Sequence, residues 1–76
     1  MIISTYQYLN SITEIANYIN KNTENEPEVV AAHYAKEAVT ESEWPLNERN
    51  IEPHLDALVE NGAKFNYSSA MQLALA

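Results

Sequence analysis

The chain has 76 residues, 46% of them hydrophobic, and a formal net charge of −7 from eleven acidic side chains against four lysines and arginines. This length and composition predict a single acidic domain over residues 1–76, near the lower size limit for an unaided hydrophobic core, and exclude a fully disordered chain. The absence of cysteine excludes disulfides and thiolate metal sites, and the charge argues against direct binding to nucleic acid or to an anionic membrane.

Residues 5–21 have the pattern of a first amphipathic helix. The capping-box spacing of Ser4 and Gln7 favours this start. Ser11 and Glu14 have the same spacing, so the helix could instead begin at residue 12, after an extended segment. The apolar stripe of this helix consists of six residues at helical spacing, namely Tyr8, Leu9, Ile12, Ile15, Ala16 and Ile19.

A second helix is predicted from Pro27 to about Thr40, because proline suits the first position of a helix. Its apolar residues, many of them alanine, spread over about 200° of the helix surface. Such a wide arc is typical of a helix with neighbours on two sides, so we expect this helix to be central. His33 and Glu37 lie four residues apart on it and are expected to touch.

Residues 41–50 contain Trp44 and Pro45 and show no periodicity, so a loop is predicted there. Trp44 is the large aromatic residue of this loop. We expect it to plug the end of the core, with its indole N–H bonded to a backbone carbonyl.

A third helix is predicted after Asn50 as its N-cap, with Pro53 in the first turn and Gly62 as a left-handed stop. After it, Ser69 is expected to cap a short uncharged helix over residues 70–76. These elements predict an all-α fold, a small bundle of three main helices plus a short C-terminal helix. The buried face of the third helix is expected to consist of Ile51, Leu55, Leu58 and Val59.

Acidic residues recur at four-residue intervals along this part of the chain. On a helix the spacing places like charges about 6 Å apart along the axis, at a cost of a few tenths of a kcal/mol per pair. A helical wheel puts Glu52, Asp56 and Glu60 beside the buried face, whereas Glu48 falls in the preceding loop if Asn50 is the cap. The residues with this spacing are the row Glu48, Glu52, Asp56, Glu60 and the pairs Glu24, Glu28 and Glu37, Glu41.

The acidic helix flank has two interpretations, a solvated helix face or a surface kept negative for recognition. An ordinary solvated face mixes signs and gains from ion pairs four residues apart. Only Arg49 and Lys64 stand at the ends of this one. The missing counter-charge favours recognition.

Catalytic and metal-binding patterns are weak in this sequence. His33 and His54 do not belong to a known ligand spacing, the serines lack an elbow motif, and a single glycine cannot build a phosphate-binding loop. We therefore expect no enzyme, no metal and no cofactor.

Neither a secretory signal nor a membrane span is visible in the sequence. The apolar residues 1–3 form a short run without a preceding basic residue. No window approaches the roughly 18 apolar residues of a transmembrane helix. A soluble cytoplasmic protein is the default expectation.

Carboxylates about 6 Å apart along a helix approximate the step between successive phosphates of a nucleic-acid strand. We therefore expect a non-catalytic acidic protein that occupies the basic, nucleic-acid-binding surface of a protein partner. We expect such a protein to be a phage or mobile-element inhibitor, such as a DNA mimic of the anti-restriction or anti-CRISPR type. The alternative is a small homodimeric adaptor or regulator that binds through an apolar and aromatic surface. The residues expected to bind the partner are Glu48, Glu52, Asp56, Glu60, Glu37, Glu41, Tyr6 and Tyr67.

Overall fold

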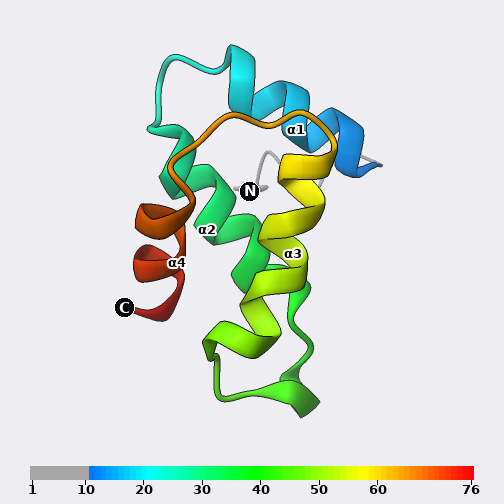
Figure 1. The fold of residues 1–76 in the computed structure, drawn as a ribbon, viewed down its shortest axis with the longest axis vertical. Helices are drawn as coiled ribbons and strands as arrows, with labels where there is room; N and C mark the ends of the chain where they lie inside the picture. The colour runs from blue at the N-terminus through cyan, green and yellow to red at the C-terminus, as the bar shows by residue number, and fades with distance from the viewer. Residues whose placement is uncertain (1–10) are drawn as a thin grey trace, which may run out of the picture.

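The computed structural model describes residues 11–76, and these form helices joined by short connections (Figure 1). No strand is present in this part of the chain, which confirms the predicted all-α class. The elements are α1 (Ile12–Lys21), α2 (Pro27–Ala38), the 3-10 helix η2 (Glu41–Glu43), α3 (Glu48–Glu60) and α4 (Tyr67–Leu75).

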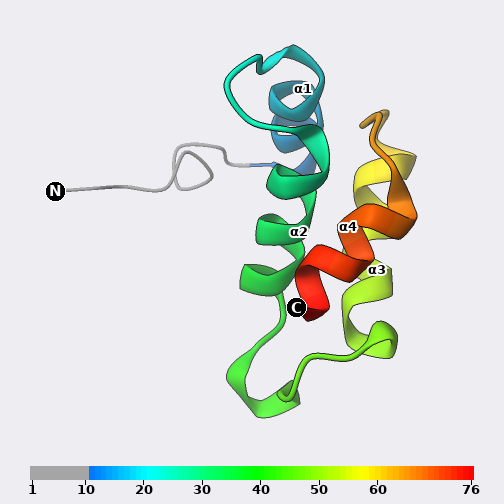
Figure 2. The same cartoon turned by 90° about the vertical axis from the view of Figure 1, so that its left-hand side faces the viewer.

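Helices α2 and α3 run side by side in opposite directions and form the middle of the molecule (Figure 1). Helix α1 lies across one end of this pair and contacts both members. Helix α4 packs along the pair and also contacts both (Figure 2). The prediction that α2 is central is therefore confirmed, and α3 shares that position.

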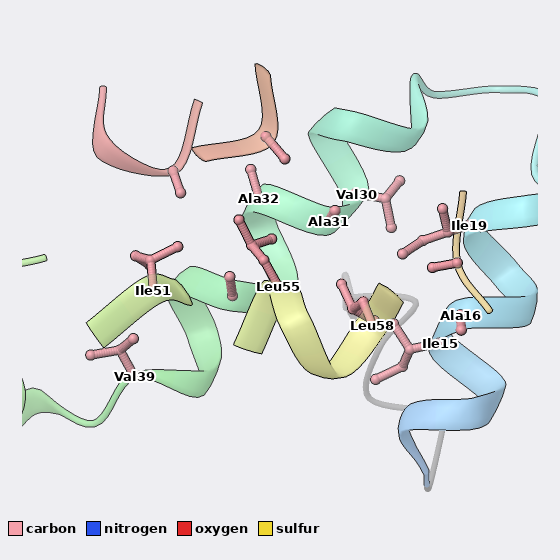
Figure 3. Packing of buried hydrophobic residues seen from close by; sticks show 14 residues of the cluster. Ile15, Ala16, Ile19, Val30, Ala31, Ala32, Val39, Ile51, Leu55 and Leu58 are labelled. Atoms are coloured by element: carbon pink, nitrogen blue, oxygen red, sulfur yellow. The ribbon is translucent and has the colours of Figure 1, made fainter. Parts of the chain in front are cut away.

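The hydrophobic core lies between the four helices (Figure 3). Larger side chains from α1 and α3 pack against alanines of α2, and alanines of α4 are buried in the same cluster. Because alanine is small, it lets helix backbones approach closely, which explains how the wide apolar arc of α2 is covered on several sides. The buried residues are Ile15, Ala16, Ile19, Val30, Ala31, Ala32, Ala35, Val39, Ile51, Leu55, Leu58, Ala63, Ala70 and Ala74.

The first helix begins at Ile12, which confirms the second of the two predicted starts. Ser11 has extended backbone angles and its side chain accepts a hydrogen bond from the Glu14 amide at 3.2 Å. A helix running without interruption through residues 5–21 is therefore wrong at Ser11. The remainder of that prediction, residues 1–10 with Tyr6 and Tyr8, lies outside the described residues.

Helix α3 begins three residues earlier than predicted. Its N-cap is Asn47, not Asn50, and the two side chains bond each other's backbone amides in a capping box at 3.0 and 2.9 Å. Glu48 is consequently the first residue of the helix rather than part of a loop. Pro53 lies in the second turn, where its missing N–H leaves the carbonyl of Arg49 without its helical donor.

Two other expectations about large apolar side chains are wrong. Trp44 does not plug the core, because 51% of its surface is exposed. Its indole N–H does meet the expected kind of acceptor, the carbonyl of Val39, at 3.4 Å. Val59 was expected on the buried face of the third helix and is 48% exposed.

The end of α3 confirms the predicted glycine stop. Gly62 has a φ of +93°, and the amides of Gly62 and Ala63 donate to the carbonyls of Val59 and Leu58, both at 3.0 Å. These two bonds form a Schellman motif, which turns the chain away from the helix axis. Helix α4 then begins at Tyr67, three residues earlier than predicted, because Asn66 rather than Ser69 is its N-cap.

Side chains of α1 and α2 hold the connection between α3 and α4. The amide of Asn20 donates to the carbonyl of Gly62 at 2.9 Å and accepts from the backbone N–H of Lys64 at 2.8 Å. Glu28 accepts from the backbone N–H of Asn66 at 2.7 Å. This connection is thus tied to two separate helices, which fixes where α4 starts and how it meets α3.

No helix among residues 11–76 has the length and apolar character that crossing a membrane requires.

Candidate functional site

The acidic row, defined as Glu48, Glu52, Asp56 and Glu60, lies wholly on α3. All four side chains are exposed. From the first to the last, the row extends about 18 Å along the axis and winds about 120° around it. The correction to the start of α3 therefore adds Glu48 to the row, and the winding means that no flat surface faces all four carboxylates at once.

Three carboxylates of the row are without a hydrogen bond or ion pair in the described part of the chain. These are Glu48, Glu52 and Glu60. Asp56 differs, because it accepts the hydroxyl proton of Tyr67 at 2.8 Å. The row therefore offers three open negative charges and one that is already engaged.

Tyr67 is half-buried and connects α4 to this row. Its ring stacks on Phe65 with centroids 6.4 Å apart, and its hydroxyl also reaches the backbone carbonyl of Glu52 at 3.4 Å. Burial raises the pKa of Tyr67 above its ordinary value, and the bond to Asp56 and the negative charges of Asp56 and Glu52 raise the pKa further. Each cause acts against the phenolate, so the hydroxyl stays a donor at neutral pH.

None of the lysine or arginine side chains in residues 11–76 forms an ion pair with a carboxylate. This range contains all fifteen charged residues of the chain. Arg49 stands within the acidic row in sequence, yet it neutralises neither Glu48 nor Glu52. The negative potential along α3 is therefore not cancelled by close internal partners.

The other predicted partner-binding residues are distributed differently. Glu37 lies on α2, where it meets His33 at 2.7 Å as predicted from their spacing. Glu41 opens η2 and is exposed, without a side-chain bond among the described residues. Tyr6 lies outside the described residues. No three acidic or histidine side chains in the described range converge closely enough to hold a metal ion, so the carboxylates are spread along the surface rather than gathered.

Trp44 lies in the connection between α2 and α3, four residues before Glu48 in the chain, and 51% of its surface is exposed. Residues close to Trp44 in the chain line an open hollow of about 590 Å³. They are Glu43, Asn47, Arg49, Asn50, Pro53 and His54. Sequence reasoning assigned Trp44 to the core and so missed it as a surface residue. The high acid content of residues 41–48 is the signal that pointed outward, since charged neighbours are rarely buried.

The structural roles of several acids were also missed. The carboxylate of Glu28 accepts a hydrogen bond from the backbone N–H of Asn66. The carboxylate of Glu43 accepts from the backbone N–H and the hydroxyl of Thr40 at 3.3 and 3.0 Å. The spacing of Thr40 and Glu43 is that of a capping box and could have been found. The contact of Glu28 crosses 38 positions in the chain and has no local sequence signal.

Comparison with known proteins returned no matching family model, no similar curated protein and no similar solved structure.

Proposed function

We propose that this protein is a non-catalytic acidic binding protein that occupies a basic, nucleic-acid-binding surface of a protein partner, in the manner of inhibitors that mimic DNA. The observation that carries the proposal is the acidic row of α3, which is exposed and has no lysine or arginine bonded to it in the described chain. Six acids have no side-chain hydrogen bond or ion pair in the described chain. Four of them lie on α3 or in the connection before it, Glu41, Glu48, Glu52 and Glu60, and the other two, Glu24 and Glu26, lie before α2.

The energetics support a charged partner rather than an unused solvated face. Like charges four residues apart destabilise a helix by a few tenths of a kcal/mol each. Chain stability alone would favour replacing some of them with lysine. A basic groove would remove this repulsion, and the release of counterions held by that groove would favour the complex further.

The test is capture of a partner from a lysate of the source cells, followed by elution with duplex DNA. We expect wild-type protein to retain a nucleic-acid-binding protein that DNA and moderate salt release. The variant Glu52→Gln with Glu60→Gln should retain much less of it. A matched control removes the same charge from Glu24 and Glu26, which are exposed and lie before α2. Equal capture by the two variants would contradict the proposal.

A second candidate function, a small homodimeric adaptor, is favoured by an apolar groove between α2 and α4. It has a volume of about 280 Å³ and is lined by Val29, Ala32, His33, Lys36 and Leu73. Val29 and Leu73 are 44% and 42% exposed, and Leu75 near the end of α4 is 38% exposed. In this reading the acids only keep the protein soluble.

Sedimentation velocity over a range of protein concentrations tests the second candidate. A dimer should dissociate in the variant Val29→Glu with Leu73→Glu, whose substitutions fall on exposed positions and spare the core. Removing α4 is the less useful variant, because Ala70 and Ala74 belong to the buried cluster. A monomer at every concentration of wild-type protein would eliminate this candidate.

A further inference from the structure

The side chain of Trp44 is a large apolar group held in solvent. It is 51% exposed, and its one polar group is already bonded to the Val39 carbonyl. Neither a cation nor a second ring occupies its faces within the described part of the chain. Tryptophan is among the residues most enriched at the energetic centres of protein interfaces, which makes Trp44 a candidate anchor.

The backbone on both sides of Trp44 is fixed by hydrogen bonds. The side-chain amide of Asn50 donates to the carbonyls of Glu43 and Pro45 at 3.0 and 3.1 Å, and Asn47 donates to Pro45 at 3.2 Å. The amide of Trp44 itself donates to Glu41 at 3.2 Å. Because this turn is already ordered, a partner that contacts the indole has little ordering entropy to overcome there.

The charges near Trp44 define which partner chemistry fits. Within residues 41–52 there are four glutamates and one arginine. Glu41 and Glu48 stand three and four residues from Trp44 and have no side-chain bond in residues 11–76. Arg49, the one arginine or lysine within residues 41–52, pairs with neither of them. An apolar partner surface would leave these carboxylates without a complement, whereas a cation would supply one.

Among cations, arginine suits this arrangement better than lysine. Its planar guanidinium stacks on an indole face and forms two parallel hydrogen bonds with a carboxylate, which a lysine ammonium cannot do. An exposed tryptophan with glutamates on both sides in the chain offers both kinds of contact.

We infer that Trp44, together with Glu41 and Glu48 three and four residues from it in the chain, is a docking point for an arginine side chain in a basic segment of the protein partner. This inference rests on the proposed function and deepens it, because it adds Trp44, which is not a member of the acidic row, as an anchor and names the kind of side chain that it takes. The acidic row supplies charge attraction for any basic partner. Trp44 supplies the preference for arginine.

The test uses two labelled peptides, nine arginines and nine lysines, at low salt. Trp44 is the only tryptophan of the chain, so its fluorescence reports this position directly. We expect the arginine peptide to change the Trp44 emission saturably and to bind at least about threefold tighter than the lysine peptide by anisotropy. The variant Trp44→Ala should lose that preference, and Trp44→Phe should keep part of it. Circular dichroism checks that both variants fold.

The outcomes separate this inference from the proposed function. If Trp44→Ala binds the arginine peptide as tightly as wild type, or if binding leaves the Trp44 emission unchanged, the inference is overturned. In that case weaker binding of both peptides by Glu52→Gln with Glu60→Gln would still support the acidic row. If wild-type protein binds neither peptide, the inference and the proposed function both fail.

Discussion

The hydroxyl of Tyr67 donates to the carboxylate of Asp56 at 2.8 Å, and this bond joins the C-terminal helix to the acidic row of α3. It has two consequences. Asp56 is less available to a partner than Glu52 or Glu60, its neighbours in the row. The position of α4 also depends on a side chain of the candidate site, so fold and site are coupled at this residue.

Replacing Tyr67 with Phe should lower the free energy of unfolding by about 1 kcal/mol, because it removes a hydrogen bond to a charged acceptor at a half-exposed position. Urea unfolding followed by circular dichroism measures the change. Because the ring and its contact with Phe65 are kept, a loss several times larger would mean that the bond is not what the substitution removes.

The same pair predicts a pH dependence on the alkaline side. The folded protein raises the pKa of Tyr67, so the folded state holds the phenolic proton more tightly than the unfolded state does. Its contribution to stability is present below the ordinary tyrosine pKa of about 10 and is lost as the pH rises above it. Urea midpoints measured from about pH 8 to 11 should fall in wild type and fall less in Tyr67→Phe. Equal slopes for the two proteins would disprove the assignment.

The two ends of the acidic row should respond oppositely to charge removal. Glu60 is the last residue of α3, where the helix dipole is unfavourable to a negative charge, whereas Glu48 is the first, where it is favourable. We expect Glu60→Gln to stabilise the fold and Glu48→Gln to destabilise it, each by a few tenths of a kcal/mol. Urea unfolding at low and high salt measures both, and the difference should shrink with salt. If the free energy of unfolding changed in the same direction in both variants, interactions other than that with the helix dipole would dominate.

Features with a local pattern were accessible from the sequence, and features that depend on distant contacts were not. The periodicity of α1 and α2, the cap at Ser11 and the stop at Gly62 each involve residues a few positions apart. The predicted start of α3 after Asn50 was wrong, because the side chain of Asn50 bonds the turn before it and Asn47 is the N-cap.

The candidate site shows the same division. The spacing of the acids identified Glu52, Asp56 and Glu60 on α3, since a four-residue period is a property of the chain alone, but Glu48 was predicted in the preceding loop. The exposure of Trp44 and the engagement of Asp56 by Tyr67 depend on how the connection and α4 pack. The bond between Tyr67 and Asp56 does not follow from a residue pattern, because these two residues are eleven positions apart and lie on different helices.

Replacing Gly62 with Ala should cost about 1–2 kcal/mol of folding free energy, because a φ of +93° places the residue where a side chain is strained. A Cβ at this position would meet nothing within 4 Å, so the cost is conformational rather than steric. Gly62→Asn should cost less, since asparagine tolerates left-handed angles better. Thermal and urea unfolding of both variants give the comparison, and equal losses would count against this reason.

Asn20 is expected to be the most important polar side chain of α1 for stability. It bonds both Gly62 and Lys64, and these two bonds attach α1 to the connection that follows α3. Asn20→Ala should therefore lower the free energy of unfolding by about 1–2 kcal/mol, about 1 kcal/mol for each bond before partial offset by the better helix propensity of alanine. Asn17→Ala is the matched control, because Asn17 is an exposed residue of the same helix without a side-chain hydrogen bond among the described residues.

The control isolates the two bonds from the change in helix propensity, since both variants gain the same alanine in α1. We expect Asn17→Ala to be neutral or slightly stabilising in urea unfolding. Hydrogen exchange of the Lys64 amide, which donates to Asn20 at 2.8 Å, should accelerate in Asn20→Ala and stay slow in Asn17→Ala. Equal stability and equal exchange in the two variants would mean that the connection is held by its glycine stop, by Glu28 and by the bond from Thr13 to Asn61 rather than by Asn20.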